Sequence, residues 1–135
     1  MHQVTVLVIE DGAEASLVCA ALALRPEVRV LDAPDLSNAL QRLEKQPGRV
    51  ALAIAGVAAL AGSADELVAR LGLRGIPVVG VVPALSPAER QRALAAGVRE
   101  IHDRPAAWRP YSELIGSVVS RFIPADSPPH PGRTS

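Results

Sequence analysis

The segment VTVLVI, residues Val4–Ile9, is a continuous apolar run near the start of the chain. It is rich in β-branched residues, and such runs suit a strand that is buried on both faces, as in a parallel sheet. Two acidic residues, Glu10 and Asp11, follow it directly. The segment therefore predicts a buried parallel strand with two carboxylates at its carboxyl end.

The rest of the chain continues this pattern by alternating strand-like and helix-like segments. Short apolar runs predict further strands at Val28–Leu31, Val50–Ile54, Ile76–Val82 and Val98–His102. Helical spacing and capping residues predict helices over Ala13–Leu24, from the cap at Asp35 to Lys45, after the capping boxes that begin at Ser63 and Ser86, and from Pro110 to Phe122. Gly56–Gly62 is expected to be a loop. Five strands alternating with five helices predict an α/β fold with a parallel sheet covered on both faces, whose functional edge lies beyond the carboxyl ends of the strands.

Composition narrows the class of protein. The 135 residues fit one domain, and 49% of them are hydrophobic, which is enough for a core. Fourteen basic residues balance fourteen acidic ones, so we expect no direct binding to nucleic acid, which usually needs a basic excess. No apolar run is long enough to cross a bilayer, and we expect neither a signal peptide nor membrane association. The single cysteine, Cys19, suits a cytoplasmic location.

Several short motifs, taken in order, resemble a response-regulator receiver domain. They are Glu10-Asp11, Ala33-Pro34-Asp35 with Ala39-Leu40, Ile76-Pro77-Val78-Val79, Arg90 through Gly97, and Arg104-Pro105. The resemblance implies a receiver-like domain over residues 1–123. Residues 124–135 are rich in Pro and Ser and lack periodicity, which predicts a disordered, proline-rich tail or the stub of a linker. The resemblance also implies a flavodoxin-like five-stranded parallel sheet in the order 2-1-3-4-5.

The same resemblance implies where the chemistry of an active receiver would lie. Such domains use an aspartate at the end of strand three to accept a phosphoryl group, and the acidic pair helps that aspartate to hold Mg²⁺. Here Ala55 stands at the acceptor position, and no carboxylate lies within a few residues of it. Val82 replaces the family's Ser or Thr. Ile101 replaces a switch aromatic that many receivers carry, and Arg104 replaces the lysine.

These departures predict a site without phosphoryl chemistry. Glu10 and Asp11 are the candidate metal ligands, but they lack a third carboxylate, so we expect neither a metal nor a cofactor. We hypothesise that Arg104 forms a charge-assisted hydrogen bond with Asp11 or Glu10 and occupies the cleft in place of the metal. The resemblance further implies a cis peptide bond before Pro105.

A second set of residues forms a candidate interaction surface. By resemblance, partners bind the fourth helix, fifth strand and fifth helix. This region supplies Arg90, Arg92, Arg99, Glu100, His102 and Asp103, with Trp108 and Tyr111 nearby. Tryptophan, tyrosine and arginine often anchor interfaces. The alternative is that Tyr111 packs in the core and the charged residues form a solvated face. For Trp108, core and interface are both open.

The leading interpretation is a non-enzymatic, phosphorylation-independent interaction module of a signalling pathway. Its partner would be a kinase, an output domain or a second copy, so a homodimer is possible. One alternative is a flavodoxin-like binder of a small ligand, although the loop at Gly56–Gly62 lacks hydroxyl groups and the acids at Glu10 and Asp11 repel phosphate. Another is a receiver that is phosphorylated at a non-standard residue.

Overall fold

A computed structural model describes residues 3–46 and 48–123 of the chain, so the tail expected over residues 124–135 lies outside the described residues. The strands are β1 (Val4–Ile9), β2 (Val28–Ala33), β3 (Val50–Ala55), β4 (Val78–Val82) and β5 (Glu100–Asp103). The helices are α1 (Gly12–Leu22), α2 (Leu36–Lys45), α3 (Val57–Gly72), α4 (Pro87–Ala96) and α5 (Trp108–Phe122). Within the described ranges, no helix has the length and hydropathy needed to span a membrane.

The strands form one parallel sheet in the order β2-β1-β3-β4-β5, which confirms the predicted topology. β1 lies between β2 and β3, and its residues from Thr5 to Ile9 are buried. At the carboxyl edge, Ile9 lies opposite Ala55, and Val82 lies opposite Asp103. The residues that follow these strands are therefore brought to one edge of the sheet.

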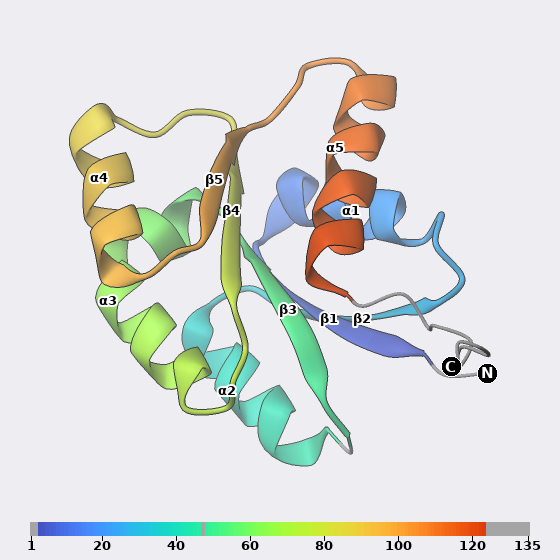
Figure 1. Ribbon diagram of the computed structural model, residues 1–135, viewed down its shortest axis with the longest axis horizontal. Helices are drawn as coiled ribbons and strands as arrows, with labels where there is room; N and C mark the ends of the chain where they lie inside the picture. The colour runs from blue at the N-terminus through green and yellow to red at the C-terminus, as the bar shows by residue number, and fades with distance from the viewer. Residues whose placement is uncertain (1–2, 47, 124–135) are drawn as a thin grey trace, which may run out of the picture.

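Helices cover both faces of the sheet. Figure 1 shows α1 and α5 together on one side and α2, α3 and α4 on the other. The first layer buries Leu22 and Ile115 against Val6 and Val8, and the second buries Leu67 and Leu71 against Leu7. The consecutive apolar residues of β1 thus alternate between two cores, which explains why its sequence is an unbroken apolar run.

The helix caps follow the sequence patterns closely. The Asp35 carboxylate accepts a hydrogen bond of 2.8 Å from the Asn38 N–H at the start of α2. Ser86 and Glu89 form the predicted capping box of α4, and Gly97 ends that helix in the left-handed conformation with φ 115°. These local signals are reliable because the cap residues satisfy helix-end N–H groups that have no partner within the helix.

The expected loop at Gly56–Gly62 is wrong. α3 begins at Val57, and Ser63, where we expected the helix to start, is a kink within it, with φ −154° and ψ 39°. The Ser63 hydroxyl donates to the Ala59 carbonyl oxygen at 3.4 Å. The segment is rich in alanine, the residue with the highest helix propensity, so it continues as helix and the capping pattern produces only a bend.

Candidate functional site

The phosphoacceptor position is closed by apolar side chains. Ala55 is the last residue of β3 and is 1% exposed, while Val82 ends β4 and is 0% exposed. Ile101 on β5 is partly buried against the same core. A methyl group has no lone pair with which to attack phosphorus, and the neighbouring strand ends offer no hydroxyl.

Glu10 covers this closed position. The Gly56 N–H donates to the Ile9 carbonyl at 3.1 Å, which places the next residue of that chain segment beside Gly56. The Glu10 carboxyl group lies so close to the Gly56 Cα that a Cβ added there would collide with it. Only glycine leaves room for this side chain, so Gly56 is part of the site, although no sequence motif indicates it.

The environment of Glu10 disfavours its charge. Burial raises its pKa above the ordinary value of 4.5, and the negative charges of Asp11 and Glu14 raise it further. A hydrogen bond of 3.1 Å from the Asp11 N–H to Glu10 Oε1 opposes these effects. Asp11 itself is exposed and is the N-cap residue of α1.

The predicted ion pair of Arg104 with Asp11 or Glu10 is wrong. Arg104 Nε lies 3.0 Å from Glu14 Oε1, in the first turn of α1. Its angle does not suit a hydrogen bond, so the buried Nε atom is close to the carboxylate without donating to it. Glu14 was not among the predicted partners of Arg104, although a helix that follows a parallel strand begins at the carboxyl edge of the sheet. No cis peptide bond occurs in residues 3–46 and 48–123, so the predicted cis bond before Pro105 is wrong and this bond is trans. Trans is the preferred state unless the surrounding turn selects the other isomer.

These residues do not fit the magnesium ion of an active receiver. Ala55 supplies no oxygen ligand, Glu14 is paired with a guanidinium, and within the described ranges no three His, Cys, Asp or Glu side chains are grouped as metal ligands would be. Mg²⁺ prefers oxygen ligands in octahedral geometry. The Arg104 guanidinium adds a positive charge where a cation would need negative partners.

Tyr111 lies inside the molecule. It is buried between α5 and the sheet, which is the alternative that the sequence left open. Its hydroxyl has no hydrogen-bond partner, and burial, with the charge of Glu14, raises its pKa strongly. Trp108, by contrast, is 46% exposed, with its ring centroid 6.0 Å from that of Tyr111. Of the two aromatic candidates, only Trp108 can reach a partner.

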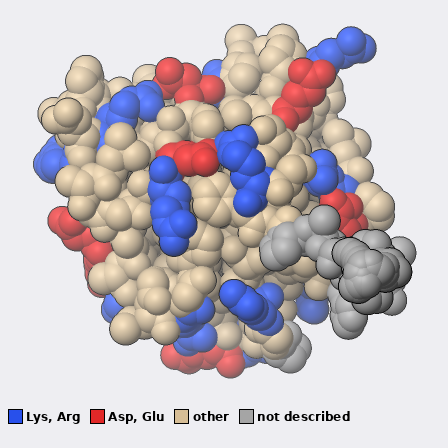
Figure 2. All heavy atoms as spheres, viewed as in Figure 1, with Lys and Arg blue, Asp and Glu red and all other residues tan. Residues whose placement is uncertain are grey.

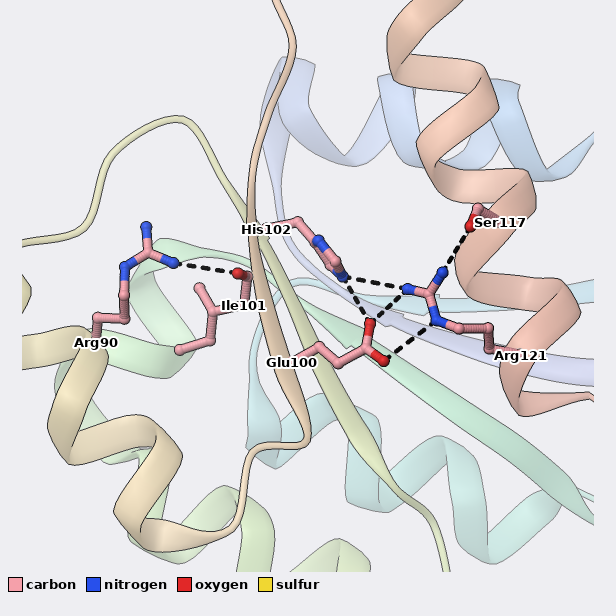
Figure 3. A network of polar contacts seen from close by, with 6 residues as sticks. All are labelled: Arg90, Glu100, Ile101, His102, Ser117 and Arg121. Atoms are coloured by element: carbon pink, nitrogen blue, oxygen red, sulfur yellow. Dashed lines mark hydrogen bonds and ion pairs between the residues drawn. The ribbon is translucent and has the colours of Figure 1, made fainter.

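Polar contacts cross the side of the molecule formed by α4, β5 and α5, which we call the α4–β5–α5 face. Figure 3 shows Arg121 reaching from α5 to Glu100 and His102 on β5. Arg121 Nε donates to Glu100 Oε2 at 3.2 Å, and His102 Nε2 lies 2.6 Å from Glu100 Oε1. The Arg121 hydrogen bonds, followed by that of His102, lower the pKa of Glu100. His102 was among the predicted surface residues, whereas Arg121 and its contact with Glu100 were not predicted.

The other predicted surface residues divide between two sides of α4. Arg90 faces β5, where it donates to the Ile101 carbonyl at 3.1 Å and to Asp103 Oδ1 at 2.6 Å. Arg92 lies on the opposite side and lines a hollow of about 300 Å³ between α3 and α4. Arg99 lies at the amino end of β5 and lines another hollow there. The α4–β5–α5 face therefore comprises Arg90, Glu100, His102, Asp103, Trp108 and Arg121.

Comparison with known proteins identifies the fold. No protein-family model and no curated protein matches the chain. Among solved structures, the phosphorylated cyanobacterial phytochrome response regulator RcpA matches with a TM-score of 0.75 at 17% identity, over 96% of this chain and all of that one.

Two further solved structures support this assignment. A response regulator from Thermotoga maritima matches with a TM-score of 0.69 at 17% identity, over 87% of this chain and 98% of that one. An orphan response regulator of H. pylori matches with a TM-score of 0.68 at 15% identity, over 88% and 96%. The resemblance expected from the sequence is confirmed, and the fold is that of a response-regulator receiver domain.

Proposed function

We propose that this protein is a phosphorylation-independent interaction module of a signalling pathway and that it has no catalytic role. The observation that carries the proposal is the buried methyl group of Ala55 at the carboxyl end of β3. Phosphoryl transfer to a receiver needs an accessible carboxylate at this position, and no change in side-chain rotamer can supply one. A cytoplasmic location is part of the same proposal.

The surroundings of Ala55 support a fixed state. Val82 has no hydroxyl group that could form a hydrogen bond with a phosphoryl group. Arg104 is paired with Glu14, with Nε and Oε1 3.0 Å apart. This ion pair joins α1 to the segment that links β5 to α5. In a receiver that switches, the corresponding lysine would instead pair with the phosphoryl group. A domain held in this way presents one surface to its partner rather than two alternative ones.

The α4–β5–α5 face supports the interaction part of the proposal. Figure 2 shows acidic and basic side chains next to one another on this side of the molecule. Arg90 and Arg121 are held by defined contacts, and the exposed Trp108 offers an apolar anchor. Arginine and tryptophan are frequent centres of binding energy at interfaces. The partner would be a kinase, an output domain or a second copy of the chain.

Incubation with acetyl phosphate and Mg²⁺, followed by intact-mass measurement, tests the proposal. We expect no added phosphoryl mass, whereas a phosphorylatable receiver treated in parallel should gain it. Ala55→Asp is the matched variant, because it restores a carboxylate at the acceptor position. Stable phosphorylation of the unaltered chain would contradict the proposal.

One observation favours a second candidate function, a receiver phosphorylated at a non-standard residue. The Glu10 carboxyl group lies against Gly56, next to the acceptor position, so an acid does occupy this edge. If Glu10 is the acceptor, the added mass should disappear in Glu10→Gln and remain in Asp11→Asn. The neighbouring negative charges of Asp11 and Glu14 disfavour the approach of an anionic phosphodonor.

A further inference from the structure

The formal net charge of zero conceals an uneven distribution along the strand direction. At the amino edge, where helices end and strands begin, six basic side chains have no hydrogen-bond or ion-pair partner among the described residues. They are Arg29, Arg42, Lys45, Arg49, Arg74 and Arg99. Figure 2 shows several basic side chains along the lower part of the surface, where α2 and α3 end, with acidic atoms beside them at the bottom of the view. Glu44, in the last turn of α2, is an exposed acid at the same edge. It offsets only one of these six charges, so the edge carries a net positive potential.

The carboxyl edge has the opposite character. Glu10, Asp11, Asp32 and Asp35 lie at or next to the ends of β1 and β2, and none of them has a basic partner. The arginines at this edge are largely neutralised, because Arg90 pairs with Asp103 and Arg104 with Glu14, while Arg109 remains unpaired. The two ends of the molecule are thus electrostatically complementary to each other.

A hollow lies at the same amino edge as the six basic side chains. It has a volume of about 270 Å³ and lies between the ends of α3 and α4 and the start of β4. Its lining combines apolar side chains, among them Val68, Ile76 and Pro77, with exposed polar atoms and the Arg99 side chain. Leu73, next to it in sequence, is 86% exposed. A cavity of about 150 Å³ can take up benzene, so this hollow has room for one large apolar side chain.

Trp108 is the side chain that fits this description at the other end of the molecule. It is the only tryptophan of the chain, it is 46% exposed, and it begins α5 beyond the carboxyl end of β5. The basic edge carries no exposed aromatic ring among the described residues, which argues against a stacked nucleic acid. Its apolar feature is concave, which argues against insertion into a membrane.

We propose that the hollow at the amino edge binds the Trp108 corner of a second copy, so that copies associate head to tail. The indole would enter the hollow, and the acids of the carboxyl edge would face Arg74 and Arg99. Such an interface is heterologous, because each copy uses two different surfaces. The proposal goes beyond the proposed function, which concerns the α4–β5–α5 face and does not require self-association.

Sedimentation velocity over a range of protein concentrations tests this proposal. We expect oligomers that grow with concentration and dissociate as NaCl rises from about 0.05 to about 0.5 M, because salt screens the facing charges. The emission of Trp108 should shift to shorter wavelength as oligomers form. A protein that stays monomeric at every concentration would leave the hollow to an acidic partner of another sequence and would overturn the proposal.

Two variants and their mixture give the decisive result. Trp108→Ala and the double variant Arg74→Glu/Arg99→Glu should each weaken association by about tenfold or more, and both change exposed residues. Mixed in equal amounts, they should form a heterodimer that grows no further, because each retains one intact surface. An absence of recovery in the mixture, or an unaltered chain that stops at a dimer as a symmetric interface would require, would overturn the proposal.

A control variant distinguishes the effect of the hollow on association from the effect of the net charge of the amino edge. Arg29→Glu/Arg49→Glu changes the net charge by the same amount but leaves the hollow intact. We expect it to weaken association by about threefold or less, since its charges do not face the bound tryptophan. Equal weakening by both double variants would show that charge alone drives association and would overturn the role of the hollow. Circular dichroism checks that every variant is folded.

Discussion

The carboxyl edge and the α4–β5–α5 face lie in the same domain but differ in how they treat polar groups. At the edge, Ala55 and Val82 are sealed from water, and the Glu10 carboxyl group is partly buried with a raised pKa. On the face, Arg121 and His102 stabilise the charge of Glu100 and lower its pKa. The buried part of the edge, at Ala55, Val82 and Glu10, disfavours charge, whereas the face accommodates it.

This difference indicates which region is free to interact. Phosphoryl chemistry needs ionised, solvent-accessible carboxylates, and the edge instead closes over a methyl group. Interfaces need exposed anchors within an ordered polar rim, and the face has Trp108 beside side chains that are held in place. The difference supports the proposal that the face binds a partner, and it indicates that the buried groups around Ala55 have a structural role.

The largest effect should come from adding a charge to each region. Val82→Asp places a carboxylate where the side chain is fully buried without a partner, and should reduce the free energy of unfolding by about 3 kcal/mol or more. Ser117→Asp adds the same charge beside Arg121 on the face and should change it by about 0.5 kcal/mol or less. Urea denaturation measures both. Equal effects would show that the edge is as open to water as the face.

The ion pair between Glu14 and Arg104 should contribute a smaller amount. Both side chains are about a quarter to a third exposed, so we expect Glu14→Gln and Arg104→Gln each to cost about 1 kcal/mol. A double-mutant cycle should give a coupling energy of similar size, because each variant removes the same contact. A coupling energy near zero would mean that the pair does not hold α1 to the β5–α5 segment.

The corresponding pair on the face should couple more weakly. Arg90 contacts Asp103 at 2.6 Å, but the Asp103 side chain is 75% exposed, and water competes for it. We expect a coupling energy of about 0.5 kcal/mol or less from the cycle of Arg90→Gln and Asp103→Asn. A larger value than that of the Glu14–Arg104 pair would reverse the ranking of the two regions.

The finest distinction is the sign of the pH dependence. The pKa of Glu10 is raised in the folded state, so its contribution to stability is fully present below 4.5 and is lost as pH rises through the raised pKa. The pKa of Glu100 is lowered, so its contribution is present above 4.5 and is lost as pH falls through the lowered pKa. Glu10→Gln and Glu100→Gln should therefore change the pH slope of the unfolding free energy in opposite directions. Changes of the same sign would refute this assignment.

A glycine substitution tests the cause of the Glu10 shift. Gly56→Ala should push the Glu10 carboxyl group toward water and return its pKa toward 4.5, as measured by NMR titration of the side-chain carboxyl carbon. Gly62→Ala is the matched control, since a Cβ there meets no other atom within 4 Å. An unchanged pKa in Gly56→Ala would mean that the contact with Gly56 does not bury the carboxyl group.

Much of the fold could be predicted because its signals are local. The bounds of β1 and the capping box at Ser86 agree with the sequence patterns, since each depends on a few neighbouring residues. The order of the strands followed from the family resemblance. The start of α3 was mispredicted, because a capping pattern at Ser63 competed with a run of alanines that has a higher helix propensity.

The candidate site was only partly predictable. The absence of a carboxylate at Ala55 is evident from the sequence in any alignment register, and the burial of Ala55 agrees with it. The partner of Arg104 was not predictable, because Asp11 and Glu14 lie one helical turn apart and either could face β5. Tyr111 likewise had two possible environments until α5 was packed against the sheet.

The sequence by itself determined the class of fold and the lack of an acceptor carboxylate at the end of β3, because both depend on residue type at fixed positions along a strand. Only the tertiary structure decided that Glu10 lies over Gly56, that Arg104 pairs with Glu14, and that Arg99 belongs to a hollow rather than to the α4–β5–α5 face. These contacts join residues from different elements. Their choice depends on how the helices pack on the sheet, and no local pattern encodes that packing.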